Sequence, residues 1–139
     1  MEAKYPGKSG DVTWIDHRSG HEYGRVDLNK ALGEGKNVVG YAMAEFVADR
    51  RQEVDLRVAS DNAVKLWLNG TLIDEHEVYH SGSQFDQYTG RGVLQPGRNV
   101  ILVKVCQNDQ PQDWARSWSF QLRVCDRAGG AVLSTDRQQ

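Results

Sequence analysis

Apolar and polar residues alternate with a period of two along most of this chain. Val54, Leu56 and Val58 form one set of alternate positions, while Asp55 and Arg57 occupy the positions between them. Because successive side chains of a β-strand point to opposite faces, this period indicates strands with one buried face. The same period recurs in three further segments, AVKLWL, NVILVKVC and SWSFQLRVC.

One segment departs from the alternation. NVVGYAMAEFVA, residues 37–48, is apolar at successive positions, which is typical of a central strand covered on both sides. VDLNKALGEG predicts the only helical turn, near residues 27–32, with Asp27 as its N-terminal cap and Gly33 at its end. Turn signals separate the strands: SDN at 60–62, NG at 69–70, SGS at 81–83, PG at 96–97 and GG at 129–130. We therefore expect an all-β chain of about eight or nine strands in one antiparallel β-sandwich.

Size and charge narrow the function classes. The chain has 139 residues with 26% charged and a formal net charge of −2. This length suits a single domain, residues 1–139, with a core over about 12–127 and flexible termini. No basic face predicts nucleic acid or anionic lipid as a partner. No apolar run reaches the ~20 residues of a membrane span, and MEAKYPGKSGD lacks the apolar region of a signal peptide.

The two cysteines are predicted to be free thiols. Cys106 and Cys125 end two consecutive strands. If these strands are antiparallel, the cysteines lie at opposite ends of the sandwich, roughly 20 Å apart at ~3.3 Å per residue. A disulfide allows at most about 7 Å between Cα atoms.

The segment HEVYH, His76–His80, matches the H-E-x-x-H pattern of zinc metalloproteases. That pattern needs a helix, which brings residues i and i+4 to one zinc ion. Here β-branched residues and the turns NG and SGS surround the motif, and an extended chain would separate the two histidines by ~13 Å. No His or Glu follows His80 to act as third ligand. Nor does the chain hold a G-x-S-x-G elbow, a P-loop or a dinucleotide-binding fingerprint. We expect a protein that is not an enzyme, without catalytic residues, and metal ligands stay unknown.

Six segments in order resemble the galactose-binding-domain-like jelly-roll modules. They are VDLNKAL, NVVGYAMAEF, DLRVASDN, VKLWLNG, LQPGRNVILVKV and SWSFQLRV. Such modules accompany β-galactosidase-type hydrolases and occur in large secreted bacterial proteins. The likeness covers about residues 14 to 127 and departs at Asn62 and Ala63, where the pattern has Asp-Gly.

The resemblance implies a non-catalytic, lectin-like accessory module that binds a glycan or polysaccharide through loops at one end of a jelly roll. It implies no required cofactor, although members commonly hold a structural calcium. It also implies an extracellular or cell-envelope location beside other domains of a larger protein, with the cytoplasm as an open alternative.

Two loops have the composition of a sugar site. Aromatic rings stack on the apolar face of a sugar, and planar polar groups bond its hydroxyls. The loop 107–118, QNDQPQDWARSW, contributes the candidates Asn108, Asp113, Trp114 and Arg116. The loop 79–88, YHSGSQFDQY, contributes Tyr79, His80 and Asp86. Trp67 marks the alternative of a site on a sheet face.

A rival reading assigns no sugar ligand. The apolar residues of NVVGYAMAEFVA would then form an interface in a protein-interaction, structural or oligomerisation domain. The sequence leaves open the glycan, calcium binding, the oligomeric state, any parent protein, and the choice between loops and sheet face.

Overall fold

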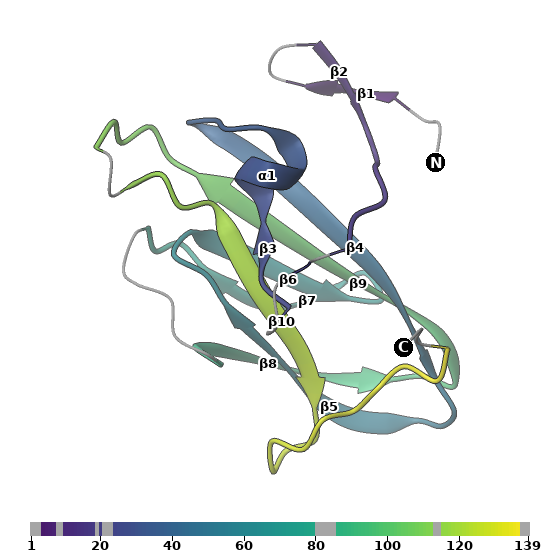
Figure 1. The fold of residues 1–139 in the computed structure, drawn as a ribbon. Coiled ribbons are helices and arrows are strands. Elements are labelled where there is room, and N and C mark those ends of the chain that lie inside the picture. The colour runs from purple at the N-terminus through teal and green to yellow at the C-terminus, as the bar shows by residue number, and fades with distance from the viewer. Residues whose placement is uncertain are drawn as a thin grey trace.

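The computed structural model describes residues 4–7, 10–18, 20, 24–79, 86–112 and 115–136. Ten strands and one short helix lie in these residues (Figure 1). In chain order they are β1 (Lys4–Gly7), β2 (Gly10–Thr13), β3 (Val26–Asp27), α1 (Leu28–Leu32), β4 (Val38–Ala48), β5 (Gln52–Ala59), β6 (Ala63–Leu68), β7 (Thr71–His76), β8 (Tyr88–Leu94), β9 (Gly97–Gln107) and β10 (Ser119–Cys125).

Eight of the strands form two four-stranded antiparallel sheets that face each other. One sheet has the order β3-β10-β5-β8 and the other the order β4-β9-β6-β7. The chain therefore changes sheet at most of its connections, and the order is that of a jelly roll built from two Greek keys. The predicted all-β antiparallel sandwich is confirmed. The helix α1 and its cap also agree with the prediction, because Asp27 accepts a hydrogen bond from the Lys30 N–H at 3.2 Å.

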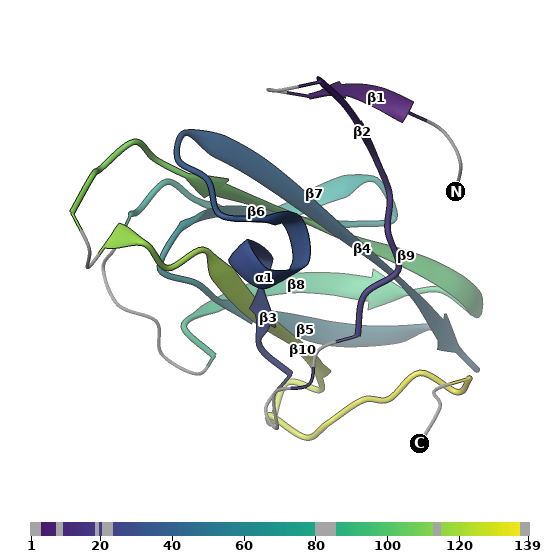
Figure 2. The same ribbon diagram turned by 45° about the horizontal axis from the view of Figure 1, so that its top comes forward.

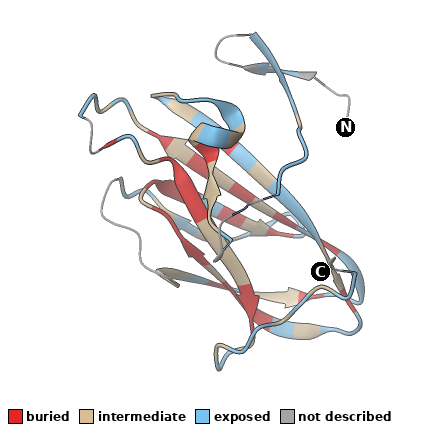
Figure 3. Ribbon diagram, viewed as in Figure 1, coloured by how far each residue is buried: buried red, intermediate tan, exposed pale blue. Residues whose placement is uncertain are grey.

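The core lies between the two sheets, where the alternate apolar residues meet (Figure 3). As predicted, the inward residues of β5, β6 and β9 are buried, and the largest fully buried side chains include Leu56, Leu66, Val103 and Val105. A Leu→Ala change in such a core typically costs about 2–5 kcal/mol. The two cysteines are free, and they lie on different sheets, with burial raising the pKa of the Cys125 thiol.

The interpretation of residues 37–48 as a central strand was wrong. This segment is β4, which lies at the edge of its sheet, and β9 is the strand with neighbours on both sides. Val39, Tyr41 and Met43 on its outer face are 47%, 46% and 41% exposed. An apolar run indicates that a strand can bury two faces, but the run alone does not show that anything covers them.

A β-hairpin that the sequence analysis missed precedes the sandwich. β1 pairs with β2 and places Tyr5 opposite Val12. Figures 1 and 2 both show this hairpin standing away from the two sheets, on the side where β4 lies. Tyr5 and Val12 are exposed, so neither of these apolar side chains of the hairpin lies in the core.

Asn99 joins two turns and strand β4 at the end of the sandwich opposite α1. Its side-chain oxygen accepts hydrogen bonds from the Gln95 N–H at 2.8 Å and from Asn69 Nδ2 at 2.9 Å. Its Nδ2 donates to the carbonyl oxygens of Phe46, Gln95 and Gly97 at 3.0–3.1 Å. Asn69 and Gly70 have φ of 50° and 82°, as the NG signal predicts for a tight hairpin turn. The sequence PGRN therefore has a structural role.

Replacing Asn99 with Asp should destabilise the protein strongly. Asp has the same shape, but its carboxylate cannot donate to the three carbonyl oxygens and would bury a charge beside them. We expect the free energy of unfolding in urea at neutral pH to fall by about 3 kcal/mol, and by less in Asn99→Ala. An Asn99→Asp variant as stable as Asn99→Ala would contradict this role for the amide.

Candidate functional site

Buried amides hold the loop between β9 and β10 onto the sandwich. Gln107, at the end of β9, donates from Nε2 to the carbonyl oxygens of Ala115, Arg116 and Ser117 at 3.1–3.3 Å. Asn62 donates to the Ser117 carbonyl at 3.0 Å and to Gln107 Oε1 at 3.2 Å. Three successive carbonyls are thus fixed by two side chains that water barely reaches. The loop 107–118 is an ordered part of the fold where the structure describes it.

Further contacts fix the same loop from α1 and the chain after it. Asn29 Nδ2 donates to the Arg116 carbonyl at 2.9 Å, and Lys36 Nζ donates to the Ala115 carbonyl at 2.6 Å. Trp118 lies in the core, where its indole N–H donates to the Val105 carbonyl at 3.1 Å. Position 40 favours glycine, because the Cβ atom of any other residue would lie 2.9 Å from Trp118 Cζ2 and clash with the indole ring.

The strand directions bring the two predicted loops to the same end of the sandwich. β7 and β9 are both antiparallel to β6, so the chain leaves both strands at one end. Figure 1 shows the segments after β7 and β9 on that side. Of the predicted ligands in the loops, Arg116 is exposed and Asn108 is half-buried, with its amide bonded to Gln110 at 3.0 Å. Asp113, Trp114 and His80 lie outside the described residues.

A pocket opens on the outer face of the β4-β9-β6-β7 sheet, close to this end. It has a volume of about 490 Å³. Its lining includes Lys65 of β6, Glu75 and His76 of β7, Glu77, the predicted ligand Tyr79, and Lys104 and Cys106 of β9. Burial raises the pKa of Tyr79, with smaller contributions from Cys106 and Glu77, so its phenol is protonated at neutral pH. The pocket therefore holds ammonium and hydroxyl donors next to carboxylate acceptors.

Three charged side chains lie next to one another in the pocket. Lys65 lies directly opposite Lys104 on one side and Glu75 on the other. Lys65 Nζ is 3.6 Å from Glu75 Oε2, and both side chains are about half exposed. Lys104 Nζ lies 5.9 Å above the centre of the Tyr41 ring. Like charges opposite each other on neighbouring strands are unfavourable, so Glu75 and the Tyr41 ring offset the repulsion between the two lysines.

An apolar row crosses the same sheet face beside the pocket. Met43 pairs with Leu102, Leu102 with Trp67, and Trp67 with Leu72, so the row spans all four strands. Trp67 is two residues from Lys65 and therefore on the same face. Met43 and Leu72, at the two ends of the row, are exposed. Sequence reasoning missed Lys65, Glu75 and Lys104 because only the pairing register places them together.

Asp86 does not belong to this pocket. It lies against the outer face of the other sheet, where Arg123 donates to it from Nε at 2.7 Å and also from Nη2. Arg57 Nη1 is 3.3 Å from the same carboxylate. Arg57 and Arg123 are directly opposite on β5 and β10, so Asp86 offsets the repulsion between two like charges, together with Asp55, whose Oδ2 is 3.3 Å from Arg57 Nη2. The Arg123 hydrogen bonds, followed by those of Arg57, hold the pKa of Asp86 below its usual range.

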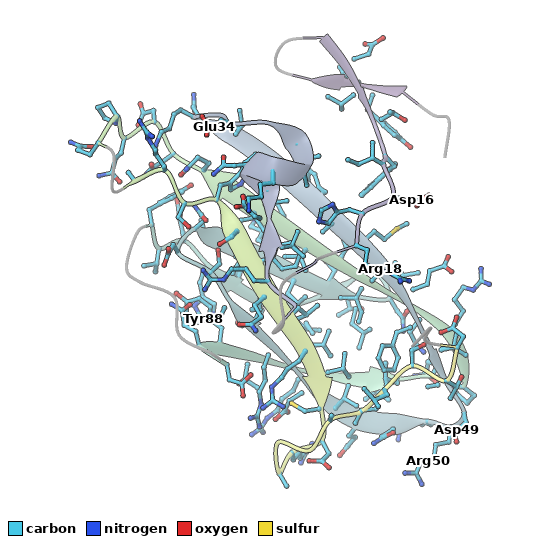
Figure 4. All side chains as sticks on the ribbon, viewed as in Figure 1. Asp16, Arg18, Glu34, Asp49, Arg50 and Tyr88 are labelled. Atoms are coloured by element: carbon cyan, nitrogen blue, oxygen red, sulfur yellow. The ribbon has the colours of Figure 1, made fainter. Side chains whose placement is uncertain are left out.

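The position of His76 argues against the zinc reading of HEVYH. His76 ends strand β7, and residues 77–79 form no helix. Its Nε2 lies 2.9 Å from Asp74 Oδ1, and its ring stacks on Tyr88 with centroids 3.7 Å apart (Tyr88 is labelled in Figure 4). Across the described part of the chain, no group of three or more His, Cys, Asp and Glu side chains is placed to hold a metal ion.

Comparison with models of protein families, with curated proteins and with solved structures gave no significant match to this chain. In the described residues, no helix is long and apolar enough to cross a membrane.

The role of Asp86 can be tested by measuring stability as a function of pH. In Asp86→Asn, Arg123 loses the carboxylate it pairs with and Arg57 keeps only Asp55. We expect the free energy of unfolding at pH 7 to fall by about 1 kcal/mol, because solvent partly screens the site. The folded pKa is lower than the unfolded one, so the contribution is complete above the unfolded pKa of about 4 and is lost as pH falls through the folded pKa. Urea unfolding from pH 7 to pH 2 should show the two proteins converging in acid. A difference that stays constant over this range would contradict the charge-based role.

Proposed function

We propose that this protein is a non-catalytic carbohydrate-binding module whose glycan lies on the outer face of the β4-β9-β6-β7 sheet. The observation that carries the proposal is the pocket containing Lys65, Lys104 and Tyr79, directly beside the row that contains Trp67. The resemblance to galactose-binding-domain-like modules supports the same class of ligand. In this role the domain would accompany other domains of a larger extracellular or cell-envelope protein.

The two neighbouring rows match the two needs of sugar recognition. Trp67 is half-buried and supplies an aromatic surface for the apolar face of a pyranose ring. In the next row of the same face, the ammonium groups of Lys65 and Lys104 can donate to hydroxyl oxygens, and Glu75 can accept from hydroxyl groups. Residues two apart on a strand are ~7 Å apart, so one sugar unit can contact Trp67 and Lys65 together.

The proposed site lies on the sheet face, whereas the sequence pointed to the loops. Asp86 is held by two arginines on the opposite sheet, and the amide of Asn108 is bonded within its own loop. Tyr79, which follows β7 at the loop end of the sandwich, lines the pocket. Trp114, Asp113, Arg116 and His80 form the alternative loop site, which a variant of Trp114 separates from the sheet-face site.

The test is a broad glycan and polysaccharide binding screen, run with and without calcium. For the glycan that binds best, we expect Trp67→Ala to weaken the affinity at least tenfold, or about 1.4 kcal/mol, because the stacking surface is lost. Trp67→Phe keeps a ring and should retain most of the affinity. Circular dichroism of each variant confirms that the fold is intact.

Trp114→Ala is the comparison variant. Undiminished binding in Trp114→Ala together with loss in Trp67→Ala supports the sheet face. Loss in Trp114→Ala with full binding in Trp67→Ala would place the glycan on the loops instead. If no glycan binds the parent protein in either condition, the carbohydrate-binding proposal is wrong.

A further inference from the structure

In the part of the chain that the structure describes, no strand lies beside one edge of β4. At its far end, the Val47 N–H donates to Ser134 Oγ at 2.9 Å, and the Val47 carbonyl accepts from the Thr135 N–H at 3.0 Å. The backbone groups of Val47 therefore point away from β9. Because the backbone direction alternates along a strand, those of Val39, Tyr41, Met43 and Glu45 point the same way. Among the described residues, the outward groups of Val39, Tyr41 and Met43 have no partner.

Nothing in residues 38–44 of this edge discourages pairing. The segment VVGYAMA contains no charge, no proline and no bulge, the devices by which natural proteins block an edge. The other edges are blocked: β3 has only two residues, β7 carries Asp74 and Glu75 beside a register shift, and β8 carries the exposed Arg91. A long apolar edge is a template for strand addition.

The N-terminal hairpin lies on the side of the molecule where this edge is. Figures 1 and 2 show β1 and β2 standing off the sandwich near β4, and the segment after β2 running down the same side (Asp16 and Arg18 are labelled in Figure 4). Tyr5, Val12 and Ile15 are 46–53% exposed. An isolated two-stranded hairpin is marginally stable in water, so its apolar residues lack a surface to cover.

We propose that two copies of this chain pair through β4, edge to edge and antiparallel, into one continuous eight-stranded sheet. The N-terminal hairpin of each copy flanks the joint and covers apolar surface of the other. The occupant of the edge is a second copy because the edge and the hairpin, two apolar features without a cover in one copy, face the same side.

The β4 edge is also complementary to itself. With a two-fold axis at Ala42, Tyr41 faces Met43 of the second copy and Val39 faces its Glu45, so no like charges are opposed. All the outward groups from Val39 to Glu45 then form ladder pairs. Since the remaining edges are blocked, such a contact closes as a dimer and does not propagate. The outer faces, with their Trp67 rows, would lie side by side in one surface.

The experiment is sedimentation velocity of the full chain over a hundredfold concentration range. We expect a dimer for the parent protein and a monomer for Met43→Lys. The protein concentration at which half of the chains are dimeric should be at least tenfold higher for the variant. Leu72→Lys is the matched control, because Leu72 is 43% exposed and Met43 41%, at opposite ends of the same row. It should dimerise like the parent. Equal loss in both variants would overturn pairing through the edge in favour of contact through the face.

A second variant tests the backbone contact itself. Tyr41→Pro removes one outward N–H but no bond to β9, and proline is accepted on edge strands in this orientation. We expect a folded monomer. A Tyr41→Pro protein that is folded and still dimeric would contradict the proposal.

Hydrogen exchange supplies a readout that does not depend on any variant. In the parent dimer, the amides of Val39, Tyr41 and Met43 should exchange slowly, and dilution to the monomer should speed their exchange at least tenfold. The amides of Gly40 and Ala42, bonded to β9, should stay slow in both states. A parent protein that is monomeric at all concentrations overturns the proposal, whether its outward amides exchange fast or are protected within one copy.

Discussion

Buried side-chain amides hold the connections of this sandwich to its two sheets. A jelly roll changes sheet at most connections, so its loops must bridge the ends of a core that cannot solvate their backbone groups. Gln107 and Asn62 satisfy three successive carbonyls at one end, and Asn99 satisfies three at the other. An amide is suited to this position because it donates and accepts without carrying a charge. The position of Arg116, a candidate ligand, depends on these bonds.

The two outer faces of the sandwich have different characters. On the β3-β10-β5-β8 sheet, Asp86 closes a charged cluster by pairing with Arg57 and Arg123. On the β4-β9-β6-β7 sheet, lysines lie next to an exposed apolar row and a pocket. The second face keeps donors, acceptors and apolar surface in contact with solvent, and both proposals concern it.

Sequence reasoning reached part of the candidate site. Tyr79 was expected to bind ligand, and it does line the pocket. Asp86 was predicted as a ligand because of the composition of the loop 79–88. Its partners Arg57 and Arg123 are distant in sequence, so the loop composition did not show that they bind this carboxylate. Lys65, Glu75 and Lys104 were absent from the prediction, because each is an ordinary surface residue of its own strand. Only the register of three strands makes them a group.

The sequence by itself determined the buried faces of β5, β6 and β9, the NG turn and the cap of α1, but not the hairpin of β1 and β2. These depend on alternation and on backbone preferences over a few residues, which are local properties of the chain. The tertiary structure alone decided the order of the strands within the sheets. That order made NVVGYAMAEFVA an edge strand with an open side, although its composition is that of a covered one. Which neighbour a strand receives depends on contacts between residues far apart in the chain, and a single segment carries no record of them.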